Sequence, residues 1–216
     1  MKSVVLLSSG LDSTVNFYEA LAQDRAGVVL CLTFDYGQRA AKKEILNSKK
    51  QCELNGIPHK VVDLKWFSEF TNTSLVSSQM DVPTDVKIES HADSVQSAKS
   101  VWVPNRNGIF LNIAAGFAEG IKADSIIVGF NKEEGATFPD NTQEYLDSMN
   151  EAFRFSTSNQ IKIKCFTTDL DKTQIVKRAK ELGVNFDLIW SCYFGEDQMC
   201  LKCESCLRYQ RAVRIN

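Results

Sequence analysis

The sequence is poor in histidine, in long apolar runs and in net charge, and each shortage excludes a class of function. The chain contains only two histidines, His59 in a predicted strand and His91 in a polar loop, so we propose no histidine base. No apolar run approaches the roughly 18 residues that a membrane-spanning helix needs. The formal net charge is −2, so the overall charge does not indicate a nucleic-acid-binding protein.

The remaining composition is that of an ordinary globular protein. Hydrophobic residues make up 44% of the chain and charged residues 24%, and 216 residues suit one domain with a substantial core. Met1 and Lys2 lead directly into the first predicted strand, with no signal peptide, so we expect a cytoplasmic protein. In that compartment we do not expect the seven cysteines to form disulfides.

Short apolar runs alternate with segments of helical periodicity along most of the chain. Strands are predicted over residues 4–7, 27–34, 59–64, 125–129 and 161–166, with helices that end near residues 24, 55, 122, 155 and 183. This alternation predicts an α/β fold in which a parallel, doubly wound sheet is covered by helices on both faces. Ligands of such sheets bind beyond the carboxyl ends of the strands.

Two segments depart from this alternation. Residues 71–100 are rich in Ser, Thr and Asp with little periodicity, so we interpret them as an insertion or flexible lid, or as an ordinary surface loop. Residues 191–216 contain most of the cysteines. We therefore expect an α/β domain over residues 1–190 and a metal-binding C-terminal segment over 191–216 packed on it.

The turn that follows the first strand carries the strongest signal for a ligand. It reads Ser8-Ser9-Gly10-Leu11-Asp12-Ser13 and opens into a predicted helix. Such a turn presents free backbone N–H groups and the positive end of the helix dipole, and serine hydroxyls can donate to phosphate oxygens. The alternative is a simple strand–turn–helix corner in which Asp12 or Ser13 caps the helix.

Four cysteines lie within fifteen residues near the C-terminal end of the sequence, at Cys192, Cys200, Cys203 and Cys206. Four thiolates can wrap one tetrahedral Zn²⁺ with no open position for water, which is typical of a structural site. An iron–sulfur cluster is the alternative, because C-x2-C-x2-C spacing also occurs there. The remaining cysteines, Cys31, Cys52 and Cys165, are expected in the core.

Several separated blocks together resemble one family. The Ser8–Ser13 turn resembles the S-G-G-x-D-S signature of the PP-loop ATP pyrophosphatases, the adenine nucleotide alpha hydrolase-like fold, and it lacks the lysine of a Walker P-loop. Within these enzymes, Asp35-Tyr36-Gly37-Gln38, the block Val103-Pro104-Asn105-Arg106-Asn107 and the cysteine segment resemble the 7-cyano-7-deazaguanine synthases of the queuosine precursor pathway. Ser9 and Asn105 stand where that family usually has glycine. Residues 136–137 and 141–142 also depart from its pattern, S-G-Y-P-D-C-R.

The resemblance implies an activity and a set of site residues. The activity is conversion of 7-carboxy-7-deazaguanine and ammonia to 7-cyano-7-deazaguanine through an acyl-adenylate and an amide, with release of AMP and pyrophosphate. Implied cofactors are ATP, Mg²⁺ and Zn²⁺. ATP is implied to bind at Leu7, Ser8, Ser9, Gly10, Leu11, Asp12, Ser13, Phe34, Tyr36 and Gln38. The implied catalytic residues are Asp12, Ser13, Lys172 and Arg106. The residues implied to bind the substrate are Arg106, Asn107, Phe138 and Asp140. The residues implied to bind zinc are Cys192, Cys200, Cys203 and Cys206.

Alternatives stay open at two of these positions and for the function. Asp140 could instead cap the following helix, and Lys172 could be a solvated first-turn lysine. The altered residues 136–142 motivate a related enzyme that transfers the activated deazapurine to another amine, such as a protein N-terminus. A zinc-stabilised tRNA-binding module is the alternative from another class. The resemblance implies a homodimer, and we expect neither a nucleic-acid nor a membrane partner.

Overall fold

Five short apolar segments pair side by side as a parallel sheet in the computed structural model, which describes residues 1–216. The strand order is β3-β2-β1-β4-β5, and every neighbouring pair is parallel. The strands are β1 (Ser3–Leu6), β2 (Val28–Asp35), β3 (His59–Asp63), β4 (Ser125–Ile127) and β5 (Lys162–Lys164). Successive strands are added on one side of β1 as far as β3, and the next strand, β4, is added on its other side. Ligands of such sheets bind at this reversal of strand order.

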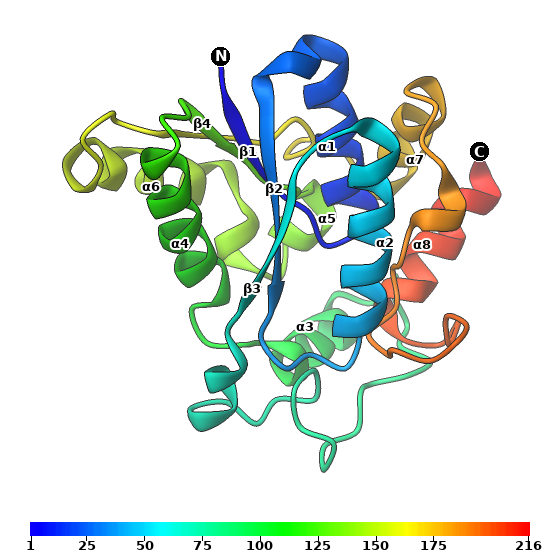
Figure 1. Cartoon of the computed structure of the whole chain (residues 1–216). Coiled ribbons are helices and arrows are strands. Elements are labelled where there is room, and N and C mark those ends of the chain that lie inside the picture. Colours follow the sequence, from blue (N-terminus) through cyan, green and yellow to red (C-terminus); the bar gives the residue numbers. More distant parts are fainter.

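Helices cover both faces of the sheet (Figure 1). One face carries α1 (Leu11–Asp24), α2 (Ala41–Asn55), α7 (Lys172–Glu181) and α8 (Glu204–Ile215). The other face carries α4 (Arg106–Gly120) and α6 (Gln143–Ser156). The helix α3 (His91–Val101) and the single turn α5 (Lys132–Gly135) lie toward the carboxyl ends of the strands. Four short 3₁₀ turns span Arg25–Gly27, Lys65–Glu69, Pro139–Asn141 and Phe186–Leu188.

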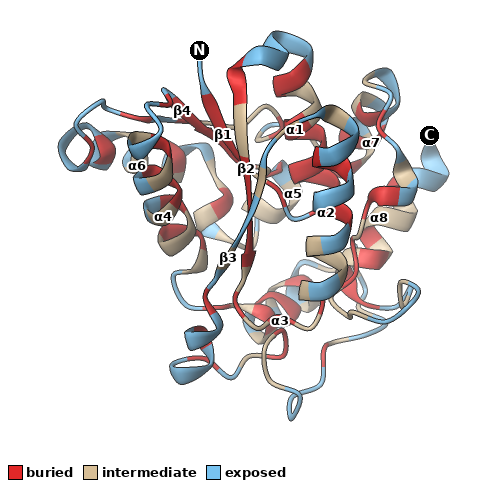
Figure 2. Cartoon of the chain, viewed as in Figure 1, coloured by how far each residue is buried: buried red, intermediate tan, exposed pale blue.

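Alternate side chains of the central strand enter opposite layers of the core. Val4 packs in the cluster that contains Ala114 of α4, and Val5 packs in the cluster that contains Phe17 of α1 and Cys52 of α2. All five side chains are fully buried. Burial on both faces explains why the strand is a continuous apolar run without polar alternation. Figure 2 shows the buried residues along the sheet and on the inner sides of the helices.

The predicted parallel, doubly wound sheet is confirmed, and two longer helices and the single turn α5 were not foreseen. Helix α3 begins within residues 71–100 and ends at Val101, and it buries Ser94, Ser97 and Ala98, small side chains that leave little hydrophobic periodicity. Helix α8 begins directly after Cys203, in a segment that we interpreted only as a source of metal ligands. No helix combines the length and the apolar composition that crossing a bilayer requires.

The close contact between β4 and α1 depends on Gly129. A Cβ atom at this residue would lie 2.4 Å from the backbone nitrogen of Ser13 and 2.6 Å from the carbonyl carbon of Asp12. We expect Gly129→Ala to push the Ser8–Ser13 turn away and to lower the free energy of unfolding by about 1–3 kcal/mol. Gly116→Ala is the matched control, because a Cβ at this exposed position in α4 meets nothing within 4 Å.

In the control, better helix propensity should raise stability by up to about 1 kcal/mol. Urea unfolding of the two variants beside the unaltered protein checks the pair. Equal stability of the two variants would contradict the role assigned to Gly129.

Candidate active site

A pocket opens at the carboxyl ends of β1, β2 and β4, where the strand order reverses. Its lining includes seven of the residues implied for ATP, and also Arg106 and Asn107. The seven are Leu7, Ser8, Gly10, Asp12, Ser13, Phe34 and Tyr36. Ser9, Leu11, Gln38, Phe138, Asp140 and Lys172 are not among the lining residues.

The turn after β1 leaves the first N–H groups of α1 free. The N-cap residue is Gly10, not Asp12 or Ser13, and no side chain caps the helix. The hydroxyl oxygens of Ser8 and Ser13 lie 3.1 Å apart, and the Ser13 hydroxyl donates to the Gly10 carbonyl at 3.1 Å. The orphan donors at a helix start are suited to bind an anion, so this geometry favours the phosphate cradle over a simple capped corner.

Ser9 is held in a backbone conformation that favours glycine. Its φ is 58°, in the left-handed region, and its side chain is fully buried with a hydroxyl oxygen that has no partner. The Ser9 carbonyl accepts a hydrogen bond from the Trp190 N–H at 2.8 Å. Since Ser9 does not line the pocket, its side chain does not crowd the place where phosphates would lie.

Lys172 is buried between two carboxylates beneath this turn. Its Nζ contacts Asp12 Oδ2 and lies 2.8 Å from Glu134 Oε1. Asn131 Nδ2 donates to the same Asp12 oxygen at 3.1 Å, which leaves Asp12 Oδ1 buried and without a partner. Lys172 is therefore not a solvated first-turn lysine. It joins the start of α7 to the first turn of α1 and to α5.

Burial and charge shift the pKa values of this trio in different directions. Burial raises the pKa of Asp12 to about 6, although the positive charge of Lys172 opposes the shift. Burial disfavours the charged form of Lys172, but Asp12 and Glu134 outweigh it and raise its pKa. Burial likewise disfavours ionised Glu134, and Lys172 more than compensates, so the pKa of Glu134 is lowered. At neutral pH the trio carries one positive and two negative charges.

Arg106 forms the opposite side of the pocket together with aromatic side chains. Its Nη1 donates to the Tyr36 hydroxyl at 3.1 Å, and the guanidinium lies 5.8 Å from the centre of that ring. Phe34 and Phe110 stack with ring centres 4.1 Å apart. Asn105, which precedes Arg106, has a φ of 50°, and asparagine tolerates this left-handed conformation better than most residues. The pocket thus combines a flat aromatic wall with a guanidinium.

Of the other residues implied for the substrate, Asn107 lines the pocket, and Asp140 and Phe138 do not. Asn107 Nδ2 donates to the backbone carbonyl of Asp140 at 3.4 Å. The Asp140 carboxylate accepts from Asn141 Nδ2 at 3.1 Å, and Thr142, not Asp140, caps α6. Phe138 stacks on Trp102 with ring centres 6.1 Å apart.

Sequence reasoning missed three polar residues of the site, namely Asn131, Glu134 and Glu44. The first two lie after β4, in the block where the family pattern is least complete, and their acidic and amide side chains were the available signal. Glu44 lies in the first turn of α2 and lines the pocket. Its position in a lysine-rich helix gave no sign of burial.

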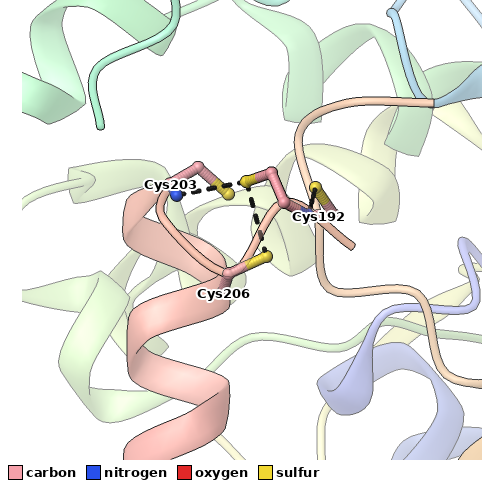
Figure 3. Close-up of side chains that lie close together, drawn as sticks. Cys192, Cys203 and Cys206 are labelled. Carbon is pink, nitrogen blue, oxygen red and sulfur yellow. Dashed lines mark hydrogen bonds between the residues drawn. The ribbon is translucent and has the colours of Figure 1, made fainter. Parts of the chain in front are cut away.

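The four cysteines converge as their spacing predicts. Their sulfur atoms all lie within 4.8 Å of one another, close enough to hold one metal ion. Cys203 and Cys206 lie at the start of α8, and Cys192 approaches from the preceding loop (Figure 3). Backbone N–H groups of Phe194 and Cys200 donate to the Cys192 sulfur at 3.3 and 3.4 Å. Such bonds stabilise thiolates, the form that binds metal.

Ion pairs connect this C-terminal segment to the pocket. Glu133 Oε2 lies 2.8 Å from Arg208 Nη1, and Glu133 Oε1 lies 2.6 Å from Arg211 Nη2. The same Glu133 Oε1 accepts the backbone N–H of Lys172 at 2.9 Å. Arg208 also donates to the Ser94 hydroxyl of α3 at 3.0 Å. One buried arginine of α8 therefore touches α3 and the loop that carries Glu134.

Comparison with known proteins places the chain in a family. The model of the family "Queuosine biosynthesis protein QueC" matches residues 2–216. A 7-cyano-7-deazaguanine synthase of Bdellovibrio bacteriovorus is 54% identical over 98% of this chain and 92% of its own length. Enzymes of the same name from Carboxydothermus hydrogenoformans and Methanocaldococcus jannaschii are 50% and 45% identical, each over 98% of this chain and over 97% and 94% of their own lengths. The chain belongs to the QueC family.

A solved structure shares the fold of this QueC family member more distantly. It is a 4-thiouridine synthetase in complex with RNA and bound ATP, with a TM-score of 0.51 and 19% sequence identity. The match covers 99% of this chain but 50% of the other, so this chain spans half the length of the synthetase. The likeness supports the PP-loop fold that the Ser8–Ser13 turn indicated.

The strained backbone at Ser9 predicts a stabilising substitution. Ser9→Gly removes a left-handed serine and a buried hydroxyl without a partner, so we expect the free energy of unfolding to rise by about 1–2 kcal/mol. Asn105→Gly is the matched comparison and should gain less, because asparagine already tolerates this conformation. Denaturant unfolding of both variants measures the difference. A larger gain at Asn105 than at Ser9 would contradict the assignment of strain.

Proposed function

We propose that this protein converts 7-carboxy-7-deazaguanine and ammonia to 7-cyano-7-deazaguanine, with ATP cleaved to AMP and pyrophosphate. Membership of the QueC family, whose curated relatives bear the synthase name along nearly their whole length, is the observation that carries the proposal. Transfer to another amine and a tRNA-binding role are not favoured. The fold shared with an ATP-bound synthetase supports ATP as the nucleotide.

The turn after β1 and Lys172 supply the groups that bind phosphates. In the proposal, the free N–H groups of α1 and the hydroxyls of Ser8 and Ser13 hold phosphate oxygens. Lys172 neutralises charge that develops on pyrophosphate as it leaves. Asp12 Oδ1, buried and without a partner, is a hard oxygen ligand of the kind that Mg²⁺ prefers, so the residues present fit that ion. When bound, Mg²⁺ would neutralise phosphate charge.

The chemistry requires activation, because a carboxylate loses hydroxide poorly. Its oxygen attacks the α-phosphorus, pyrophosphate leaves, and the resulting acyl-adenylate has AMP as a good leaving group. Ammonia then yields the amide, and a second activation removes the amide oxygen to give the nitrile. The protein positions the reactants and stabilises charge, so no nucleophilic side chain is needed.

The deazaguanine end is assigned to the opposite side of the pocket. Arg106, held by Tyr36, is placed to meet the anionic carboxylate, and Asn107 lies beside it. The Asp140 carboxylate and the ring of Phe138 lie next to these residues and would contact the base as it enters. The two carboxylate oxygens of Asp140 can accept hydrogen bonds from the two parallel N–H groups on the guanidine-like edge of a deazaguanine.

The C-terminal cysteines are proposed to hold Zn²⁺ with a structural role. Four converging sulfur atoms leave no open position, which suits zinc. Such a site needs reduced thiols, which supports a cytoplasmic protein. We also propose a homodimer and no nucleic-acid partner, the latter supported by the formal charge of −2.

The reaction is tested by supplying purified protein with 7-carboxy-7-deazaguanine, ATP, Mg²⁺ and ammonium. We expect nitrile, with AMP and pyrophosphate as the nucleotide products. Lys172→Met should lower kcat on the order of 10²–10³-fold, because a buried cation at the phosphates is lost. Lys177→Met, an exposed lysine of the same helix, should leave the rate unchanged. Formation of ADP and orthophosphate, or of no nitrile, would exclude the proposed activity.

Removing the metal should destabilise the C-terminal segment and then the active site. Cys203→Ser is expected to abolish zinc binding and to cost several kcal/mol of stability. ATP cleavage should fall too, because Arg208 and Arg211, which hold Glu133, lie on the helix that Cys203 begins. Cys165→Ser, a cysteine outside the cluster, is the control. Elemental analysis and thermal unfolding measure both effects, and iron in place of zinc would overturn the metal assignment.

A further inference from the structure

Three carboxylates line the pocket, and only one of them lacks a basic partner. Asp12 and Glu134 both form ion pairs with Lys172. Glu44 forms no ion pair in the structure, and its side chain borders the same pocket. A carboxylate that is already neutralised by a lysine is a poor proton acceptor, so Glu44 is the pocket carboxylate that remains free to take a proton.

The Glu44 carboxylate is held in place by the loop that follows β2. Gln38 Nε2 donates to Glu44 Oε2 at 2.8 Å, and Gln38 is itself fixed because its Oε1 accepts the Tyr36 N–H at 3.0 Å. Gln38 Nε2 also donates to the Phe34 carbonyl at 3.0 Å. No hydrogen bond within the chain involves Glu44 Oε1. One carboxylate oxygen is therefore anchored, and the other is available to a molecule in the pocket.

The surroundings of Glu44 tune it toward proton transfer near neutral pH. Burial raises its pKa to about 7; the hydrogen bond from Gln38 and the charge of Arg106 on α4 oppose the shift, while Asp35 at the end of β2 adds to it. Tyr36, also beside Glu44, stays neutral because burial raises its pKa. A general base works best when its pKa lies close to the operating pH.

We propose that Glu44 is the general base that accepts protons from the ammonia nitrogen during amide and nitrile formation. The inference rests on the proposed function, which requires such an acceptor and for which the two histidines offer none. His59 lies on β3 with Nε2 2.8 Å from the Thr33 hydroxyl, and His91 starts α3; neither lines the pocket.

In the first round, the ammonia nitrogen forms a bond to the acyl carbon and becomes positively charged. Glu44 takes one proton from it, the bond between the acyl carbon and the AMP oxygen breaks, and AMP leaves with that electron pair. In the second round, the amide oxygen attacks the α-phosphorus and displaces pyrophosphate. The nitrogen then loses two protons in turn to Glu44, which releases each to water, and AMP again leaves with the electron pair of the carbon–oxygen bond.

Glu44→Gln keeps the size of the side chain and an oxygen that can accept from Gln38, but it cannot take a proton. Glu53→Gln, the same substitution at an exposed position of α2, is the matched control. Three reactions are compared in each protein: substrate-dependent exchange between ATP and labelled pyrophosphate, amide formation from ammonium, and hydroxamate formation from hydroxylamine. Hydroxylamine is a weaker base than ammonia and is largely unprotonated at neutral pH, so it needs less help from a base.

In Glu44→Gln we expect unchanged exchange, amide formation lowered on the order of 10²–10⁴-fold and hydroxamate formation lowered far less. In the unaltered protein, amide formation measured at a constant concentration of free ammonia should fall as the pH drops through about 7, since Glu44 then takes up a proton. The residual amide formation by Glu44→Gln, measured in the same way, should not show this decrease.

Equal losses of amide and hydroxamate would show that Glu44 only supports the pocket and would overturn the proposal, as would undiminished amide formation. Loss of exchange in Glu44→Gln, with exchange kept in the unaltered protein and in Glu53→Gln, would assign Glu44 to the activation step and would also overturn the proposal. Absence of exchange in the unaltered protein would instead remove the proposed function, and the role of Glu44 with it.

Discussion

The ammonium group of Lys172, buried between Asp12 and Glu134, is the interaction on which the architecture of the site depends. Its partners lie in the first turn of α1 and in α5, while Lys172 itself begins α7. Removing one member of a buried ion pair leaves an uncompensated charge and costs about 3–5 kcal/mol. The starts of α1 and α7 and the turn α5 are therefore held in one arrangement, which fixes the position of the free N–H groups of α1.

The same arrangement extends outward through neighbouring residues in the sequence. Glu134 pairs with the Lys172 side chain, and Glu133 binds the Lys172 backbone N–H together with Arg208 and Arg211. Because Cys206 lies two residues before Arg208, a metal held by the cysteines fixes the helix that positions these arginines. The C-terminal segment also shares a core with the helices on this face, since Ala212 packs in one cluster with Leu11 and Val15 of α1. The cysteine cluster is thus connected, through Arg208, Arg211 and Glu133, to the position of Lys172.

The sequence was most informative where local pattern decides structure. Apolar runs such as residues 4–7 and 27–34 become strands because both of their faces are buried, and the cysteine spacing alone brings four sulfur atoms together. The roles of Glu44 and Glu133 could not be read in this way. Both lie in charged helical segments, and the charges that act on them come from elements distant in the sequence, Arg106 for Glu44 and Arg208 for Glu133. Local pattern carries no information about such partners.

The two departures from the family's glycines show what a sequence pattern can and cannot say. Ser9 and Asn105 both occupy left-handed backbone positions, so the glycine preference at each reflects backbone conformation and not room for a ligand. Asparagine meets that demand at little cost, whereas serine does not, so Ser9 holds the turn after β1 under strain. The Trp190 N–H bound to the Ser9 carbonyl, directly before the cysteine segment, ties this turn to the C-terminal part of the chain. The strained turn is therefore held from two sides, by α1 and by the segment that leads into the cysteine cluster, which makes the C-terminal segment a support of the Ser8–Ser13 turn and not an appendage to it.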